Sequence, residues 1–438
     1  MRRWLLLLLL TVQGPAWAWG NHALLSYRAL EASPEVRAAA AVTAEPLEDF
    51  LRAQAPAIAR LLDEQEAWAR AEIRDYRPRP DVLRLPPEAP VEQLRSQFLR
   101  ALRVSPNAGF SLFLQIDPRY PSATAQGLDP QRLSSVPMSK GATQRFVALQ
   151  PGQLVSALAV VASASDEPDY GYDIDLFDDN PDGGGLGFGV QPFGNPALRV
   201  SSQAPFHMGF FHQGAVFNSL APAFARSFAQ LRVHQYSGLA ALAFRTGHAY
   251  WGWRFTGLAM HYVQDLAQPY HASAAPGARL PGMVWANLLD KLGRPDRKRG
   301  LVVLQSNRHF VLETYQTRLL LAAAQAGRDG ANEQALRNSR LDGGYPTWSA
   351  HYLRDVVARE AFDAGPATDA AIVVGAPSRY VTDPDFDFGA ATGIDLDAEM
   401  RQQLQAQRDA LQAAIARLLG HAGAHSRNLV RGVLQAAR

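Results

Sequence analysis

The stretch HAYWGWRFTGLAMHYVQDLAQPYH, residues 248–271, carries the features from which we predict the fold. It continues an apolar segment that starts near residue 214, and up to residue 267 its apolar spacing suits helices. The aromatic cluster from His248 to Trp253 is expected to be helix core; a cation–π cradle for a quaternary ammonium group is the alternative. The chain shows no alternating strand pattern of any length. The sequence therefore predicts an all-α, mainly helical protein.

A metal-ligand pattern ends this stretch. His261 and Asp265 are four residues apart, which places an imidazole and a carboxylate side by side on one helix face. Pro269 ends or bends the helix, so His271 can approach from a different direction. Zinc requires ligands that converge at about 2 Å, and a helix pair with a residue beyond the turn supplies them. From these residues alone, an exposed ion pair is the alternative to a metal site.

The rest of the chain alternates helical stretches with long loops. Helices are expected at about 23–75, 91–102, 153–165, 303–326, 347–362 and 398–419. Segments rich in Pro, Gly and Asp predict loops at 77–90, 167–205 and 363–395. We expect one helical domain over 19–362, with an insertion at about 77–150 and the 167–205 loop. A linker and a C-terminal helix, packed on the same domain, would follow at 363–438.

The first residues predict export. Arg2 and Arg3 precede the apolar run 4–10 and the small-residue pattern that ends at Ala18, as in a secretory signal peptide cleaved after residue 18. A membrane anchor, the alternative, needs roughly 20 consecutive apolar residues. This run is interrupted at Thr11. We therefore expect a secreted or periplasmic protein.

Composition restricts the chemistry. The 438 residues include no Cys, so a transition metal would be bound by His, carboxylates or backbone groups. Lys and Arg number 43 and Asp and Glu 41, and loss of residues 1–18 removes two arginines, which leaves the mature chain near neutral. Such a balance lacks the basic excess of a nucleic-acid-binding protein.

Two further features supply metal ligands. His309 and Glu313 repeat the four-residue spacing within an apolar sequence, where a lone buried carboxylate would be costly. A buried His–Glu pair is the alternative, although two such pairs in one chain favour a metal. Cleavage after Ala18 would also free the amine of Trp19, which can chelate together with its own carbonyl, three residues before His22.

The motifs HxxxDxxxxxH at 261–271 and HxxxE at 309–313, with the mature Trp19, together resemble the trinuclear zinc phosphodiesterases. This family contains the bacterial zinc-dependent phospholipases C and the single-strand-specific zinc nucleases. The resemblance covers about residues 19–30 and 151–320. It implies a helical fold of this type with three zinc ions per chain.

The resemblance also implies a ligand set and asks for one more Asp and one more His. Asp166 and His207 fit the family's context best, and Asp169 and His212 are the alternatives. One zinc would then be bound by Asp166, His207, His261 and Asp265, and a second by His271, His309 and Glu313. Trp19 and His22 would bind the third and share Asp265 as a bridge.

Two departures from the family pattern concern the substrate cleft and the third zinc. The Asp166–His207 spacing is much wider than in typical members, and the Trp19–His22 gap is shorter. The insertion includes an Asp-rich run, 173–182, which we expect to be a solvated loop; calcium binding is the alternative.

The implied chemistry is hydrolysis of a phosphodiester by zinc-activated water, with Asp166 as the candidate to orient or deprotonate it. Glu313 in place of Asp, the absence of Cys and the neutral charge favour a phospholipase C that cleaves the glycerol-side bond of lipids such as phosphatidylcholine at a membrane surface. The step Ala204-Pro205-Phe206 before His207 also resembles the nucleases, where an aromatic helps to stack a base. A single-strand-specific nuclease is therefore one alternative, and a non-catalytic, zinc-stabilised exported protein is another. We expect a monomer and infer no protein partner.

Overall fold

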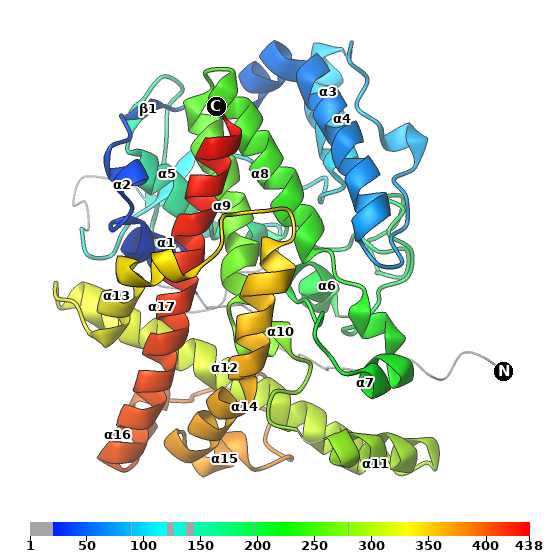
Figure 1. Cartoon of the computed structure of the whole chain (residues 1–438), viewed down its shortest axis with the longest axis vertical. Helices are drawn as coiled ribbons and strands as arrows, with labels where there is room; N and C mark the ends of the chain where they lie inside the picture. The colour runs from blue at the N-terminus through cyan, green and yellow to red at the C-terminus, as the bar shows by residue number, and fades with distance from the viewer. Residues whose placement is uncertain (1–20, 89, 121–126, 137–143, 197, 279) are drawn as a thin grey trace.

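The computed structural model describes residues 21–88, 90–120, 127–136, 144–196, 198–278 and 280–438. The predicted signal peptide and Trp19 lie outside these residues. The described chain is all-α, as predicted: helices α1–α17 account for most of it, and the strands form two small sheets (Figure 1). Within these ranges no helix is both long enough and apolar enough to span a membrane.

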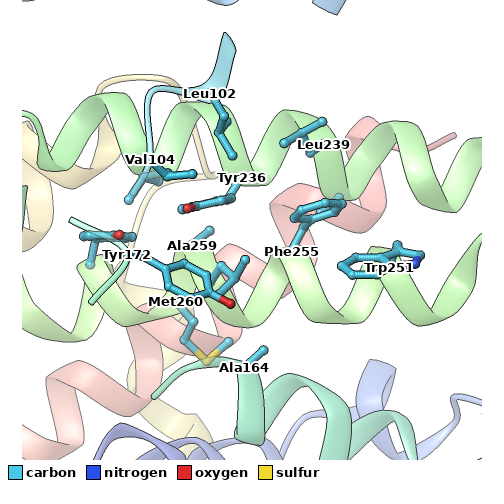
Figure 2. Packing of buried hydrophobic residues seen from close by; sticks show 14 of the residues in the cluster. Leu102, Val104, Ala164, Tyr172, Tyr236, Leu239, Trp251, Phe255, Ala259 and Met260 are labelled. Atoms are coloured by element: carbon cyan, nitrogen blue, oxygen red, sulfur yellow. The ribbon is translucent and has the colours of Figure 1, made fainter. Parts of the chain in front are cut away.

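Helix α9, Ala249–Leu266, is the central element, and every residue from Tyr250 to Leu266 is buried. Helix α8, Ala229–Arg245, packs along it after a short turn. In Figure 2, Tyr236 of α8 faces Phe255 of α9, with ring centroids 6.3 Å apart. The aromatic start of α9 is therefore helix core, as predicted.

Helix α5, Ala157–Ala164, approaches α9 unusually closely at Gly257. A Cβ atom at Gly257 would lie 2.4 Å from the carbonyl oxygen of Val161 and 2.6 Å from the Cβ of Ala164. Only glycine permits this contact, because real Cβ atoms do not approach other atoms so closely. The contact brings the end of α5, and the loop that follows it, next to the C-terminal half of α9.

The C-terminal helices pack on the same body. Helix α17, Gln405–Ala436, runs along α1, His22–Leu30, and contacts α9 and α14, Ala358–Gly375 (Figure 1). Its residues Leu429 and Val430 belong to the same apolar cluster as the core of α9. Helix α12, Asp296–Gln325, also contacts α14.

The remaining elements are shorter. The other helices are α2 (Pro34–Arg37), α3 (Leu47–Glu72), α4 (Val91–Leu102), α6 (Ala204–His207), α7 (Ala215–Leu220), α10 (Pro269–Ala272), α11 (Leu280–Lys291), α13 (Ala331–Leu336), α15 (Ser378–Val381) and α16 (Leu396–Arg401). One antiparallel sheet pairs β1 (Val42–Thr43) with β5 (Leu154–Val155). The other has the order β2 (Phe113–Gln115), β4 (Phe146–Ala148), β3 (Gly127–Leu128), also antiparallel.

The structure corrects several predicted boundaries. The loop expected from residue 363 is wrong at its start, because α14 continues through Pro366 to Gly375. Burial of Thr368 and Ile372 outweighs the helix-breaking tendency of the proline. The final helix also extends beyond the predicted end at 419, to Ala436. The 167–205 segment is mainly irregular, as predicted, with 3₁₀ turns at Glu167–Tyr170 and Arg199–Gln203.

Candidate metal centre

Buried His, Asp and Glu side chains form three groups that can hold metal ions. Within each group the ligand atoms lie within 4.8 Å of one another. The groups are His22, Asp169 and His261; His207, His261 and Asp265; and His271, His309 and Glu313. These side chains come from α1, the 3₁₀ turn after α5, and helices α6, α9, α10 and α12. Segments from widely separated parts of the sequence therefore converge on one buried region.

Asp265 connects two of the groups. Its Oδ1 atom lies 3.4 Å from Nε2 of His22. Its Oδ2 atom lies 2.9 Å from Nδ1 of His207 and 3.2 Å from Nε2 of His261. Because the two oxygens face different imidazoles, this carboxylate has the geometry of a bridge between two cations, the role that the resemblance implies for it.

Each of three imidazoles uses one nitrogen outside the groups. His261 Nδ1 donates to the carbonyl oxygen of Ser165 at 2.8 Å, and His271 Nδ1 donates to the carbonyl oxygen of His207 at 2.7 Å. His22 Nδ1 donates to Gln264 Oε1 at 2.9 Å. Such contacts keep a proton on Nδ1 and leave Nε2 as the atom available to a cation, as in metal-binding histidines. In all three residues that Nε2 atom points into a group.

The third group has the dimensions of a zinc site. His271 Nε2 and His309 Nε2 are 3.0 Å apart, and Glu313 Oε1 lies 2.6 Å from His309 Nε2 and 3.4 Å from His271 Nε2. Ligands at about 2 Å from a tetrahedral zinc are separated by roughly 3.3 Å. Pro269 starts α10 and so ends α9, which turns His271 towards α12.

Several atoms of the first two groups have no hydrogen-bond partner although they are buried. They are the Nε2 atoms of His22 and His207 and both carboxylate oxygens of Asp169 and of Asp265. More than about nine in ten buried polar groups in proteins are paired. Atoms of this kind, all potential ligands and all facing one region, fit a bound cation.

Burial and neighbouring charges shift the pKa values of several side chains in these groups. Burial lowers the pKa of His22 and His207, but nearby carboxylates raise it more, to about 9 and about 10. Burial lowers the pKa of His261 to about 3, and burial raises the pKa of Asp169 well above its usual range. For Asp265, burial is outweighed by His261 and His207, which lower its pKa. Opposite shifts among neighbours are typical of functional sites.

The structure distinguishes Asp166 from Asp169, the two candidates for one ligand position that the sequence left open. Asp166 belongs to none of the three groups: its Oδ1 atom accepts from the backbone N–H of Ala23 at 3.2 Å, so it supports the start of α1. Asp169, the alternative, faces the imidazoles, with Oδ1 3.7 Å from His261 Nε2. Both belong to a turn anchored by Glu167, which accepts two hydrogen bonds from Arg254 of α9, at 2.8 and 2.9 Å.

Of the two histidines that the sequence offered for this position, the geometry favours His207 over His212. His207 lies in the second group, whereas Nε2 of His212 contacts the carbonyl oxygen of Arg354 at 2.7 Å. His212 therefore lies outside the three groups. Trp19 is outside the described residues, so the N-terminal ligand stays a prediction.

Asp173 is a site residue that the sequence analysis missed. Its Oδ2 atom lies 3.4 Å from Nε2 of His207 and accepts from Tyr262 at 2.6 Å, while Arg232 donates to its other oxygen at 2.8 Å. The expectation of a solvated loop is thus wrong for this fully buried carboxylate, although Asp178 and Asp179 are exposed. Four more aspartates follow it by residue 182, and the sequence does not distinguish the buried one from the others.

No protein-family model, no curated protein and no solved structure matches the chain. The functional conclusion therefore rests on the geometry of the three groups.

Proposed function

We propose that the chain is an exported zinc-dependent phosphodiester hydrolase of the phospholipase C type. The observation that carries this proposal is the convergence of three buried ligand groups on one region, where Asp265 connects two of them and several carboxylate and imidazole atoms are unpartnered. The absence of Cys and the mixture of His with carboxylates suit zinc in an oxidising compartment. The order of these ligands, and the spacings within residues 261–271 and 309–313, resemble those of the zinc phosphodiesterases described above.

In this proposal the zinc ions are bound by His22, Asp169, His207, His261, Asp265, His271, His309 and Glu313, with the N-terminus at Trp19 completing the set. Bound zinc would supply a water of lowered pKa and positive charge near the phosphoryl oxygens. Asp169 takes the role first given to Asp166. Both of its buried carboxylate oxygens lack a hydrogen-bond partner, so they are available to orient or deprotonate the water.

The outer contacts keep the ligands in place. Ser165, Gln264 and the backbone of His207 orient three imidazoles, and Asp173 faces the fourth. Gln268 donates to Glu313 Oε1 at 3.0 Å and so fixes the carboxylate of the third group. Ligands that are oriented before the reaction lose little freedom when metal and substrate bind.

A lipid substrate is favoured over a nucleic acid. Phe206, the aromatic next to His207, is fully buried and packs with Phe177 and Phe228, so it cannot stack on a base. The mature chain is close to neutral, and binding of a polyanion usually depends on a basic surface. The proposed substrate is therefore a phospholipid such as phosphatidylcholine, cleaved on the glycerol side of the phosphate.

The test uses the purified mature protein on phosphatidylcholine vesicles and on single-stranded DNA, each with and without a chelator. Chelator-sensitive release of a phosphorylated head group is the expected result. Cleavage of DNA alone would replace the phospholipase proposal with the nuclease alternative. Bound zinc with neither activity would indicate a metal that only stabilises the fold.

A further inference from the structure

Helix α11 exposes a row of apolar side chains. Val284, Trp285, Leu288 and, just after the helix, Leu292 have exposed fractions of 38%, 49%, 45% and 68%. At about 100° per residue these positions fall in one sector roughly 100° wide. Helix α11 projects from the body of the protein, at the lower right of Figure 1. The row is thus a coherent face and not a set of scattered residues.

This face is not the one by which α11 attaches to the protein. On the opposite side, Ala286 is buried and Met283 packs against an aromatic cluster that includes Phe217 and Phe224. A surface helix normally presents polar residues to solvent once its apolar stripe is packed. Helix α11 is apolar on its outer side as well, which marks an interaction surface.

Cations border the apolar row. Lys291, Arg294 and Arg297 are exposed, and no carboxylate partner for them occurs in the part of the chain that the structure describes. The two other cations of the segment are paired: Lys298 contacts Asp290 at 2.7 Å and Arg299 contacts Asp296 at 2.5 Å. The unpaired charges are therefore those next to Leu288 and Leu292.

We propose that the outer face of α11 and the turn after it dock on an anionic lipid surface. Tryptophan and leucine enter the interfacial layer, while lysine and arginine bind anionic head groups. A nucleic acid would use the cations but offers nothing that buries Leu288 or Leu292. This proposal rests on the proposed function, since it assumes that the substrate lies in that surface.

The position of α11 links the docking face to the metal centre. Its anchoring aromatic cluster includes Met208, which follows the candidate ligand His207 directly, and contacts Ala274, three residues after His271. Helix α11 then leads into α12, which carries His309 and Glu313. Docking through α11 would therefore fix the orientation of the ligand groups relative to the membrane.

The experiment measures sedimentation of the zinc-loaded mature protein with vesicles. One variant carries Trp285→Ser and Leu288→Ser, another carries Lys291→Gln, Arg294→Gln and Arg297→Gln, and the matched control carries Leu404→Ser and Arg401→Gln, two exposed positions elsewhere. We expect the charge variant to lose about 100-fold in affinity for phosphatidylglycerol-containing vesicles. We expect a comparable loss in the apolar variant, and neither loss in the control. Equal sedimentation of all four proteins would overturn the proposal.

Fluorescence gives a second readout. Trp285 is the exposed tryptophan among the described residues, so brominated lipids should quench emission in the wild type and much less in Trp285→Phe. Equal quenching in both proteins would contradict docking through α11, as would binding of single-stranded DNA that depends on the same three cations while vesicles are ignored.

Hydrolysis of a soluble short-chain phosphatidylcholine separates the two proposals. If α11 variants lose vesicle binding while the wild type cleaves no phospholipid of either kind, docking is supported and the phospholipase proposal fails. If the wild type cleaves the soluble substrate and the variants bind and cleave vesicles normally, the docking proposal fails and the enzyme proposal stands. We expect the α11 variants to lose hydrolysis of vesicles and to cleave the soluble substrate as the wild type does.

Discussion

The Nε2 atoms of His271 and His309 lie 3.0 Å apart in the buried interior, and Glu313 Oε1 lies 2.6 Å from the second of them. His271 Nδ1 donates a hydrogen bond to the carbonyl oxygen of His207, so its Nε2 atom faces the imidazole of His309 with a lone pair. A cation shared by these three atoms explains an arrangement that would otherwise leave imidazole nitrogens face to face in the core.

Glu313→Gln should therefore remove one metal per chain. The amide cannot supply the negative charge that the third group needs, and loss of even an outer contact typically costs about 10- to 100-fold in metal affinity or activity. We expect elemental analysis to show one zinc fewer and phospholipid hydrolysis to fall at least about 100-fold. Glu72→Gln, in a loose surface pair with His351 at 3.9 Å, is the control. An unchanged zinc content in Glu313→Gln would remove this residue from the site.

Asp169 and Asp166 can be distinguished by the same measurement. Asp169→Asn should lower both zinc content and activity, because both of its oxygens face imidazoles without a hydrogen-bond partner. Asp166→Asn retains a carbonyl oxygen for the N–H of Ala23, so it should keep its zinc and lose about 1 kcal/mol of stability or less. The reverse pattern would restore Asp166 as the ligand.

Asp173→Asn tests the orientation of His207. Removing this charge leaves Arg232 buried without its ion-pair partner and releases Nε2 of His207. We expect zinc affinity to fall by about 10- to 100-fold and unfolding to become easier by about 3 kcal/mol or more. Asp178→Asn, in the exposed part of the same loop, should change neither quantity. If Asp173→Asn lost stability but bound zinc as the wild type does, its role would be structural only.

The local part of the site was predictable from the sequence. His261 and Asp265 form a four-residue pair on one helix, as do His309 and Glu313, and helix geometry alone makes such pairs neighbours. The all-α fold followed from apolar spacing in the same way. These predictions required no knowledge of contacts between distant segments.

The long-range part was not predictable. The choice between Asp166 and Asp169 depends on how the turn after α5 is anchored by Arg254, and the burial of Asp173 depends on Arg232 and Tyr262. Each contact joins residues about 60 to 90 positions apart, and no local pattern encodes it. Helix α14 crosses Pro366 for a related reason, since packing of the whole helix outweighs a local preference.

Acid stability should depend on His234. Burial lowers its pKa to about 4, and its ring stacks on Trp68 with centroids 3.9 Å apart. Because the unfolded chain takes up this proton near pH 6.5 and the folded chain only near pH 4, the contribution is full above pH 6.5 and is lost as the pH falls towards 4. Between pH 7 and pH 5 the loss is at most about 2 kcal/mol.

The measurement is urea unfolding of the wild type and of His234→Phe at both pH values. Phenylalanine keeps the stacking on Trp68 but cannot take up a proton. We therefore expect the variant to lose less stability than the wild type between pH 7 and pH 5. Parallel losses in the two proteins would show that His234 is not the group responsible.

The N-terminus provides the most specific test of the metal centre. His22 is fully buried, with Nε2 3.4 Å from Asp265, and residue 19 lies three residues earlier, so its amine can be no more than about 11 Å from the start of α1. A chain with one Ala before Trp19 has an amide in place of that amine, and we expect it to bind one zinc fewer and to lose most activity. Trp19→Phe keeps the amine and should bind the same amount of zinc as the wild type. If the extended chain retained all its zinc, the N-terminal ligand would be excluded, and the group of His22, Asp169 and His261 would hold its ion without the amine.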